Sequence, residues 1–179
     1  MTAMQRLASF RSRAAWVFED DFDTDQIIGV ANLKVQDEEA LAQLAMTRFD
    51  RDFRRDVRPG DMLVGGKNFG YGHPHAVGMK AMRKLGIRAV VAESFFPSYW
   101  INEIGCGFLQ IVCPGIAAAV QRWDDLDIDF ESRHIRVVRT GQVLPIKPYS
   151  DRDVDILLAG GLTKLLMSNR ASNRQMLAS

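Results

Sequence analysis

The segment Gly65-Gly66-Lys67-Asn68-Phe69-Gly70-Tyr71-Gly72-His73-Pro74-His75 contains four glycines within eight residues and two of the three histidines of the chain. It follows the apolar run 62–64 and precedes a helical pattern over 76–85. The predicted order is therefore strand, glycine-rich loop and helix N-terminus. Such a loop lets the backbone approach a ligand closely and directs free N–H groups toward an anion. We expect any ligand site of this chain to lie in this loop.

The spacing of these glycines matches neither of the common phosphate-binding motifs. It is not G-x-G-x-x-G, and Lys67 is not followed by the Ser or Thr of a P-loop. A tight connection between a strand and a helix, with glycines at positive φ, would have the same composition. From the loop alone, the two interpretations remain open.

On both sides of the loop, apolar runs typical of buried strands alternate with helical patterns. Strands are predicted at 14–18, 62–65, 87–92 and 109–113. Helices are predicted at 37–47, at 76–85 with its end at Gly86, at 98–104 with its end at Gly105, and at 117–123. A hairpin at 127–130 and 134–138 follows, and then one helix over 151–166, which contains Gly160-Gly161 and has Ser150 as its N-cap. This order predicts an α/β domain with a parallel central sheet and an antiparallel appendage.

Composition indicates one globular domain spanning residues 1–179, with residues 1–13 expected to be a poorly ordered lead-in. Apolar residues make up 47% and charged residues 25% of the chain, and the net charge is +1. Nothing in this balance favours nucleic acid or a membrane surface as a partner. The N-terminus lacks the apolar core of a secretory signal, so a cytoplasmic location is expected. The charged segment 48–58 is expected to be a solvated surface.

The two cysteines, Cys106 and Cys113, are separated by six residues. This is not the spacing of a zinc or iron–sulfur site. We expect both to be small buried residues of a strand region, and we expect no metal to be bound by this chain.

Three segments, taken together, resemble the small subunit of the aconitase-like hydro-lyases, the family typified by 3-isopropylmalate dehydratase (isopropylmalate isomerase). The first segment is Asp23-Thr24-Asp25-Gln26-Ile27-Ile28, and the second runs from Gly65 to Gly72. The third runs from Leu85 to Phe95 and is followed, at the distance typical of the family, by Asn102-Glu103-Ile104-Gly105. The resemblance extends from about residue 16 to residue 167. It implies the swivelling β/β/α domain of the aconitase C-terminal type. It also implies a small hydroxy acid as substrate and a large-subunit partner that carries a [4Fe–4S] cluster, with no cofactor on this chain.

The loop departs from the family where the family reads Gly-Ser-Ser-Arg-Glu. This chain reads Gly72-His73-Pro74-His75-Ala76 at the same place, with no gap. In the family the first serine is the catalytic base and the arginine binds a substrate carboxylate. The resemblance therefore assigns His73 to the base and His75 to substrate binding. The segment 29–34, which helps to set substrate choice in relatives, also lacks the usual Pro-x-Arg-Tyr/Phe-Leu.

The exchange of serine and arginine for histidines has a physical interpretation. A histidine, with a reference pKa near 6.5, is a usable base at neutral pH. His75 cannot reproduce the permanent, bidentate cation of an arginine, and Pro74 removes one N–H that could bind an anion. The loop therefore keeps a base but binds a carboxylate less strongly.

The remaining candidate site residues each have a structural alternative. Asp23 is a catalytic candidate and Asp25 a substrate-binding candidate, yet 23–25 would also form a turn and helix cap. Lys67 and Asn68, with the backbone of Gly70 and Gly72, could bind substrate or simply close the loop.

Three functions remain open. The first is a hydro-lyase small subunit with an altered substrate preference. The second is a scaffold or regulatory subunit that has lost the catalytic serine and arginine. The third is a metal site formed by His73 and His75, for which no further carboxylate or cysteine lies nearby in sequence.

Overall fold

The structure is a computed structural model that describes residues 3–72 and 75–177, with side chains as far as Ala171. Its centre is a seven-stranded sheet in the order β4-β3-β2-β1-β5-β6-β7. The strands are β1 (Phe10–Val17), β2 (Met62–Gly65), β3 (Ala89–Ala92), β4 (Leu109–Val112), β5 (Asp125–Asp129), β6 (His134–Val137) and β7 (Val143–Pro145). Strands β1 to β4 pair in parallel, whereas β5, β6 and β7 continue the sheet antiparallel from β1. The predicted α/β class, with its antiparallel appendage, is confirmed.

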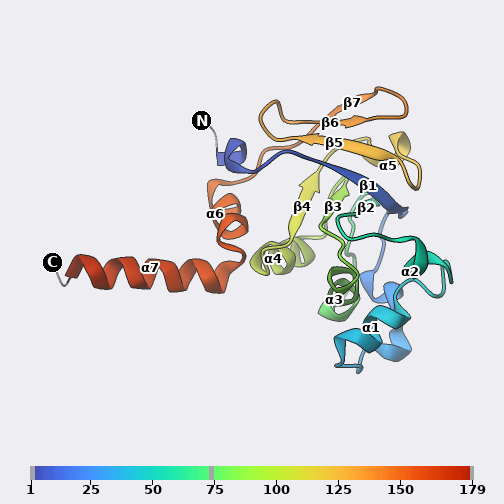
Figure 1. The fold of residues 1–179 in the computed structure, drawn as a ribbon, viewed down its shortest axis with the longest axis horizontal. Coiled ribbons are helices and arrows are strands. Elements are labelled where there is room, and N and C mark those ends of the chain that lie inside the picture. Colours follow the sequence, from blue (N-terminus) through green and yellow to red (C-terminus); the bar gives the residue numbers. More distant parts are fainter. Residues whose placement is uncertain (1–2, 73–74, 178–179) are drawn as a thin grey trace.

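Side chains of the parallel strands alternate between two hydrophobic cores, as the pleat of a strand requires. Leu63 and Val90 point into the first core, and Met62 and Val91 into the second. The first core is shared with α1 (Glu38–Leu44), α3 (Ala76–Lys84) and α4 (Pro97–Gly105), which lie together on one side of the sheet (Figure 1). The second core is closed by α5 (Ile116–Ala119) and by inward side chains of the antiparallel strands.

The N-terminal segment is more regular than expected. Ala3–Arg6 form a 3-10 turn in which Met4 is buried, and β1 begins at Phe10 rather than at Ala14. Phe10 pairs with Ile128 and Arg13 with Asp125, so the start of β1 belongs to the antiparallel part of the sheet. For residues 3–13, the part of this segment that the structure describes, the expectation of a poorly ordered lead-in is therefore corrected. The polar residues Arg11 and Arg13 interrupted the apolar pattern and concealed this half of the strand.

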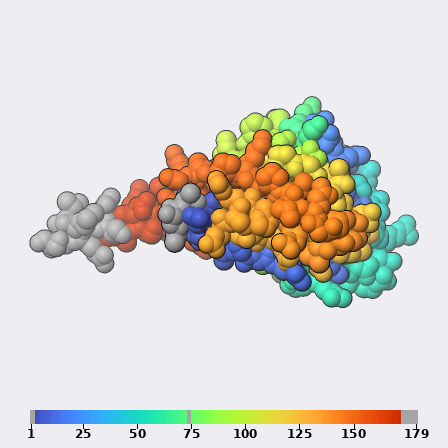
Figure 2. Space-filling view, turned by 90° about the horizontal axis from the view of Figure 1, so that it is seen from above, coloured from blue at the N-terminus to red at the C-terminus, as the bar shows by residue number. Residues whose placement is uncertain are grey.

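The C-terminal helix predicted over 151–166 is in fact two helices, α6 (Asp151–Ala159) and α7 (Leu162–Leu177). Gly160 and Gly161 both have positive φ, at 75° and 121°, and this ends α6. The predicted N-cap is confirmed, since Ser150 Oγ accepts the backbone N–H of Asp153 at 3.1 Å. Helix α7 extends away from the body of the molecule in both views (Figures 1 and 2).

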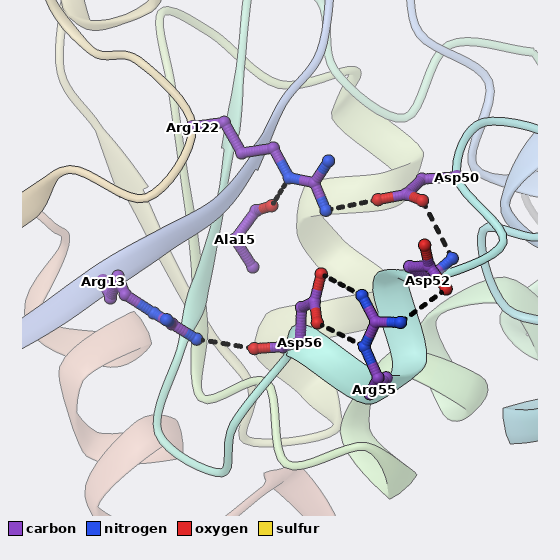
Figure 3. A network of polar contacts seen from close by, with 7 residues as sticks. All are labelled: Arg13, Ala15, Asp50, Asp52, Arg55, Asp56 and Arg122. Atoms are coloured by element: carbon purple, nitrogen blue, oxygen red, sulfur yellow. Dashed lines mark hydrogen bonds and ion pairs between the residues drawn. The ribbon is translucent and has the colours of Figure 1, made fainter.

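The charged segment 48–58 forms a network of ion pairs around α2 (Phe53–Asp56) (Figure 3). Arg55 pairs with Asp52 and Asp56, and Arg122 pairs with Asp50 at 2.5 Å. The segment is largely exposed as predicted, although Phe53 is fully buried in the first core. None of the helices in the described part of the chain has the length and hydropathy of a membrane span.

Candidate functional site

The glycine-rich loop lies at the carboxyl end of the parallel strands and is held there by backbone hydrogen bonds. Gly66 N–H donates to the carbonyl of Phe18 and Gly70 N–H to that of Phe22, while Phe69 N–H donates to Ser94. The loop then leads to His75, which is the N-cap residue of α3. His73 and Pro74, the proposed base and its neighbour, lie outside the described residues.

Gly70 is a position where only glycine fits. Its φ is +84°, and a Cβ there would lie 2.2 Å from Cγ of Tyr99, which projects from α4 and is buried. The loop therefore packs directly on an aromatic ring. At Gly70, glycine is therefore required by the tight connection between strand and helix, which is one of the two interpretations that the sequence left open.

The side chain of Asn68 is hydrogen-bonded within the structure, whereas the side chain of Lys67 is exposed. The Asn68 amide donates to Asp21 at 2.6 Å, and its backbone N–H donates to Ser94 Oγ. The Lys67 backbone N–H donates to Asp20 Oδ1 at 2.6 Å, while its side chain is exposed. Asn68 thus holds the loop in shape, and the Lys67 ammonium is left facing solvent.

The two aspartates of segment 23–25 have different partners. Asp23 caps the 3-10 turn η2 (Thr24–Ile27), because its Oδ1 accepts the backbone N–H of Asp25 at 2.9 Å. A Cβ on Gly72 would lie 3.4 Å from Asp23 Oδ2, so this carboxylate adjoins the residue that precedes His73. Asp25 instead reaches His75, with Oδ2 at 2.7 Å from the ring Nδ1.

A close approach between α3 and η2 brings Asp25 and His75 together. A Cβ on Gly78 would lie 2.3 Å from the carbonyl oxygen of Thr24, so the helix could not lie so near with a larger residue there. The imidazole of His75 is half exposed, whereas the Asp25 side chain is only 7% exposed. A buried carboxylate therefore supports an accessible histidine ring.

A cavity of about 200 Å³ opens beside this pair. It is lined by Thr24, His75, Ala76, Met79, Tyr99, Asn102, Glu103 and Cys106. The hydroxyl of Thr24 is buried and has no hydrogen-bond partner among the described residues. Ala76 is the first residue of α3, so the positive end of that helix lies at the cavity wall. The cavity thus combines an imidazole, a helix N-terminus and an apolar wall.

Glu103 of α4, which lines the cavity, forms an ion pair with Arg83 of α3. Burial raises the pKa of Glu103, and the nearby charge of Arg83 opposes that rise. Burial also raises the pKa of Tyr99 well above its ordinary value. Sequence reasoning did not select Glu103 or Arg83 as site residues, although Asn102-Glu103 belongs to a segment that carried the family resemblance.

The cysteines are not both buried, which corrects the sequence expectation. Cys113 is buried after β4, and burial raises the pKa of its thiol to about 12. Cys106 is exposed at the C-cap of α4 and lines the cavity. Within residues 3–72 and 75–171, no three His, Cys, Asp or Glu side chains are grouped so that they could hold a metal ion.

Comparison with known proteins gives consistent matches over most of the chain. The profile of the aconitase C-terminal domain matches residues 22–115. The chain is 40% identical to the 3-isopropylmalate dehydratase small subunit 1 of Methanopyrus kandleri, over 85% of this chain and 89% of that one. It is 37% identical to the isopropylmalate/citramalate isomerase small subunit of Methanocaldococcus jannaschii, over 89% of this chain and 95% of that one.

The fold is also similar to a solved structure. The crystal structure of 3-isopropylmalate dehydratase (LeuD) from Methanocaldococcus jannaschii aligns with a TM-score of 0.84 and 29% sequence identity. The alignment covers 94% of this chain and 99% of that one. The family resemblance stated from the sequence is therefore confirmed at the level of both sequence and fold.

Proposed function

The chain belongs to the family of the aconitase C-terminal domain and the 3-isopropylmalate dehydratase small subunits, and from this premise we propose that it is the small subunit of a two-subunit hydro-lyase. As a single swivelling domain, it would act on a 2- or 3-hydroxy acid resembling 3-isopropylmalate or an alkylmalate. The observation that carries this proposal is the Asp25–His75 pair, which faces a cavity beside the glycine-rich loop.

The name small subunit, borne by the relatives, implies a large-subunit partner. We propose that this partner carries the [4Fe–4S] cluster that the family resemblance implies. Such a cluster would act as a Lewis acid toward the hydroxyl group of the substrate. The contribution of this chain is then to bind the hydroxy acid, orient it and move a proton.

His73 is the proposed general base. It would take a proton from the carbon next to a carboxylate, and the electron pair of that C–H bond would form the double bond as hydroxide leaves the adjacent carbon, giving an α,β-unsaturated acid. The hydroxide would take up a proton from solvent to become water, and His73 would later return its own proton to solvent. Asp23 adjoins Gly72 and is the proposed catalytic partner of His73. The neutral form of an imidazole is the one that accepts a proton.

Substrate binding is assigned to the same loop. His75 and the first turn of α3 border the cavity, and the Lys67 ammonium is exposed at the other end of the loop. Asn68 and Gly70 already make hydrogen bonds that shape the loop, so we propose that they and Gly72 contribute by setting its path. Asp25 would contribute through His75.

The loss of the arginine predicts weaker binding of 3-isopropylmalate. Removing a charged, bidentate contact costs on the order of 2–3 kcal/mol, which is roughly a 30- to 150-fold loss of affinity. We expect the assembled enzyme to have a correspondingly lower kcat/KM on 3-isopropylmalate than a relative with the Ser-Ser-Arg loop. A panel of hydroxy acids, assayed with both enzymes, measures this. Equal kcat/KM values on 3-isopropylmalate would contradict the proposed role of His75.

The hydro-lyase proposal is tested by mixing this chain with the large subunit. We expect neither chain alone to form the unsaturated acid and the mixture to form it, as followed by its ultraviolet absorbance. Two results would overturn the proposal. One is full activity of this chain alone in the presence of a chelator. The other is a large subunit whose activity is unaffected by this chain, which would instead favour the scaffold interpretation.

A further inference from the structure

Both carboxylate oxygens of Asp25 are committed to a single residue. Oδ2 lies 2.7 Å from the His75 ring Nδ1, and Oδ1 accepts the His75 backbone N–H at 3.2 Å. The two residues are 50 positions apart in the chain, one on η2 and the other at the start of α3. This carboxylate therefore fixes the backbone and the ring of His75 at the same time.

The contact also determines which ring nitrogen faces the cavity. A carboxylate oxygen can only accept a hydrogen bond, so the hydrogen of this contact resides on His75 Nδ1. The other nitrogen, Nε2, is then the one available to a ligand, on a side chain that is 51% exposed and lines the cavity. The neutral ring with its hydrogen on Nδ1 has none on Nε2, whereas a ring protonated on both nitrogens also donates from Nε2.

We infer that Asp25 is a positioning residue, which holds His75 so that the Nε2–H of its imidazolium form donates to the carboxylate of the substrate. Asp25 itself does not touch the substrate. Where the family has a single arginine, this chain thus has an imidazole that is hydrogen-bonded to the buried carboxylate of Asp25. This inference rests on the proposed hydro-lyase function, because that function supplies the substrate carboxylate.

The tautomer of His75 gives a test that requires neither the partner nor activity. The chain has only three histidines, so ¹⁵N NMR of the full chain with labelled histidine, with the rings neutral, resolves His75 once His134→Gln and His75→Gln have assigned the signals. We expect the Nδ1–H form in the wild type. In Asp25→Asn, Oδ1 can keep the backbone bond while the amide donates to Nδ1, so we expect the Nε2–H form.

Two further variants complete the NMR test. Asp25→Glu retains a carboxylate and should keep the Nδ1–H form. Asp37→Asn changes another capping aspartate, on α1, and should leave the His75 signals unchanged. An identical tautomer in the wild type and in Asp25→Asn would overturn the positioning role, whatever the outcome of the activity assay.

Kinetics of the assembled complex give the second test. We expect Asp25→Asn to raise KM about tenfold and to change kcat less than about threefold, because the assigned role is in binding. In a His75→Ala background, Asp25→Asn should have no further effect on KM. Additive effects of the two substitutions, or a fall in kcat with KM unchanged, would contradict the inference.

Discussion

At the scale of single residues, the loop is fixed by steric exclusion as much as by hydrogen bonds. Gly70 lies against the ring of Tyr99, and Tyr99 stacks on Phe95 with the two rings nearly parallel at 12°. Phe69 packs edge-on against the same tyrosine, with ring centroids 5.4 Å apart. The path of the loop toward the cavity therefore depends on a glycine that packs against a buried aromatic ring.

Replacing Gly70 by alanine is expected to destabilise the chain by about 3 kcal/mol, since it combines an unfavourable positive φ with overpacking against Tyr99. Gly141→Ala is the matched control. Gly141 has a similar φ of +71°, but no atom lies within 4 Å of its added Cβ, so a loss of only about 1 kcal/mol is expected. Urea unfolding measures both values. Equal losses would show that the Tyr99 contact is unimportant.

The residue scale is also where sequence reasoning reached its limit. The sequence alone could not show whether the aspartates of segment 23–25 cap a helix or serve as functional carboxylates. The structure assigns the cap to Asp23 and the histidine contact to Asp25. No pattern within one segment could show this, because the contact joins residues 50 positions apart. The exposure of Cys106 was missed for a similar reason, since it depends on where α4 ends.

At the scale of elements, the periodic helices and apolar strands were predicted correctly and the polar or interrupted ones were not. The strands of the parallel sheet were found because both of their faces are buried. Strand β7 was missed because its three residues are mostly exposed. Helix α4 ends at Gly105, as predicted, whereas the glycine with positive φ after it is Gly107, at +77°. Local composition does not say which of two nearby glycines adopts positive φ.

An ion pair between Asp124, just before β5, and Arg139, just after β6, should make the stability of the fold depend on pH. Hydrogen bonds from Arg139, and then from the backbone of Gln121, hold the pKa of Asp124 below its ordinary value of 3.8. A carboxyl group with a lowered folded-state pKa contributes stability above its ordinary pKa. That contribution is lost as the pH falls through the folded value.

Asp124→Asn is therefore expected to lower the free energy of unfolding at pH 7 by on the order of 1 kcal/mol, a modest value because the Arg139 side chain is 42% exposed. The difference from the wild type should shrink as the pH falls below about 4. Urea unfolding at a series of pH values measures it. Asp155→Asn, which removes an exposed pair with Arg6, serves as the control and should have little effect at any pH. A difference for Asp124→Asn that is independent of pH would contradict this explanation.

At the scale of the whole molecule, the two halves of the sheet have separate roles. The parallel half places the glycine loop, η2 and α4 around one cavity, whereas the antiparallel strands close the second core. The fold class could be predicted from the sequence because the order of elements alone restricts it. The cavity could not, since it forms where three distant segments meet: Thr24, His75–Met79 and Tyr99–Cys106.

The central claim is that this chain supplies active-site groups to its partner rather than merely supporting it. The most direct measurement is kcat of the assembled complex that carries His73→Ala and His75→Ala together, with assembly confirmed by co-elution of the two subunits. Loss of the proposed base and carboxylate contact should lower kcat by roughly 10²–10⁴-fold, the usual contribution of general acid–base catalysis. A complex that assembles normally and keeps the wild-type kcat would contradict the claim and identify the chain as a scaffold.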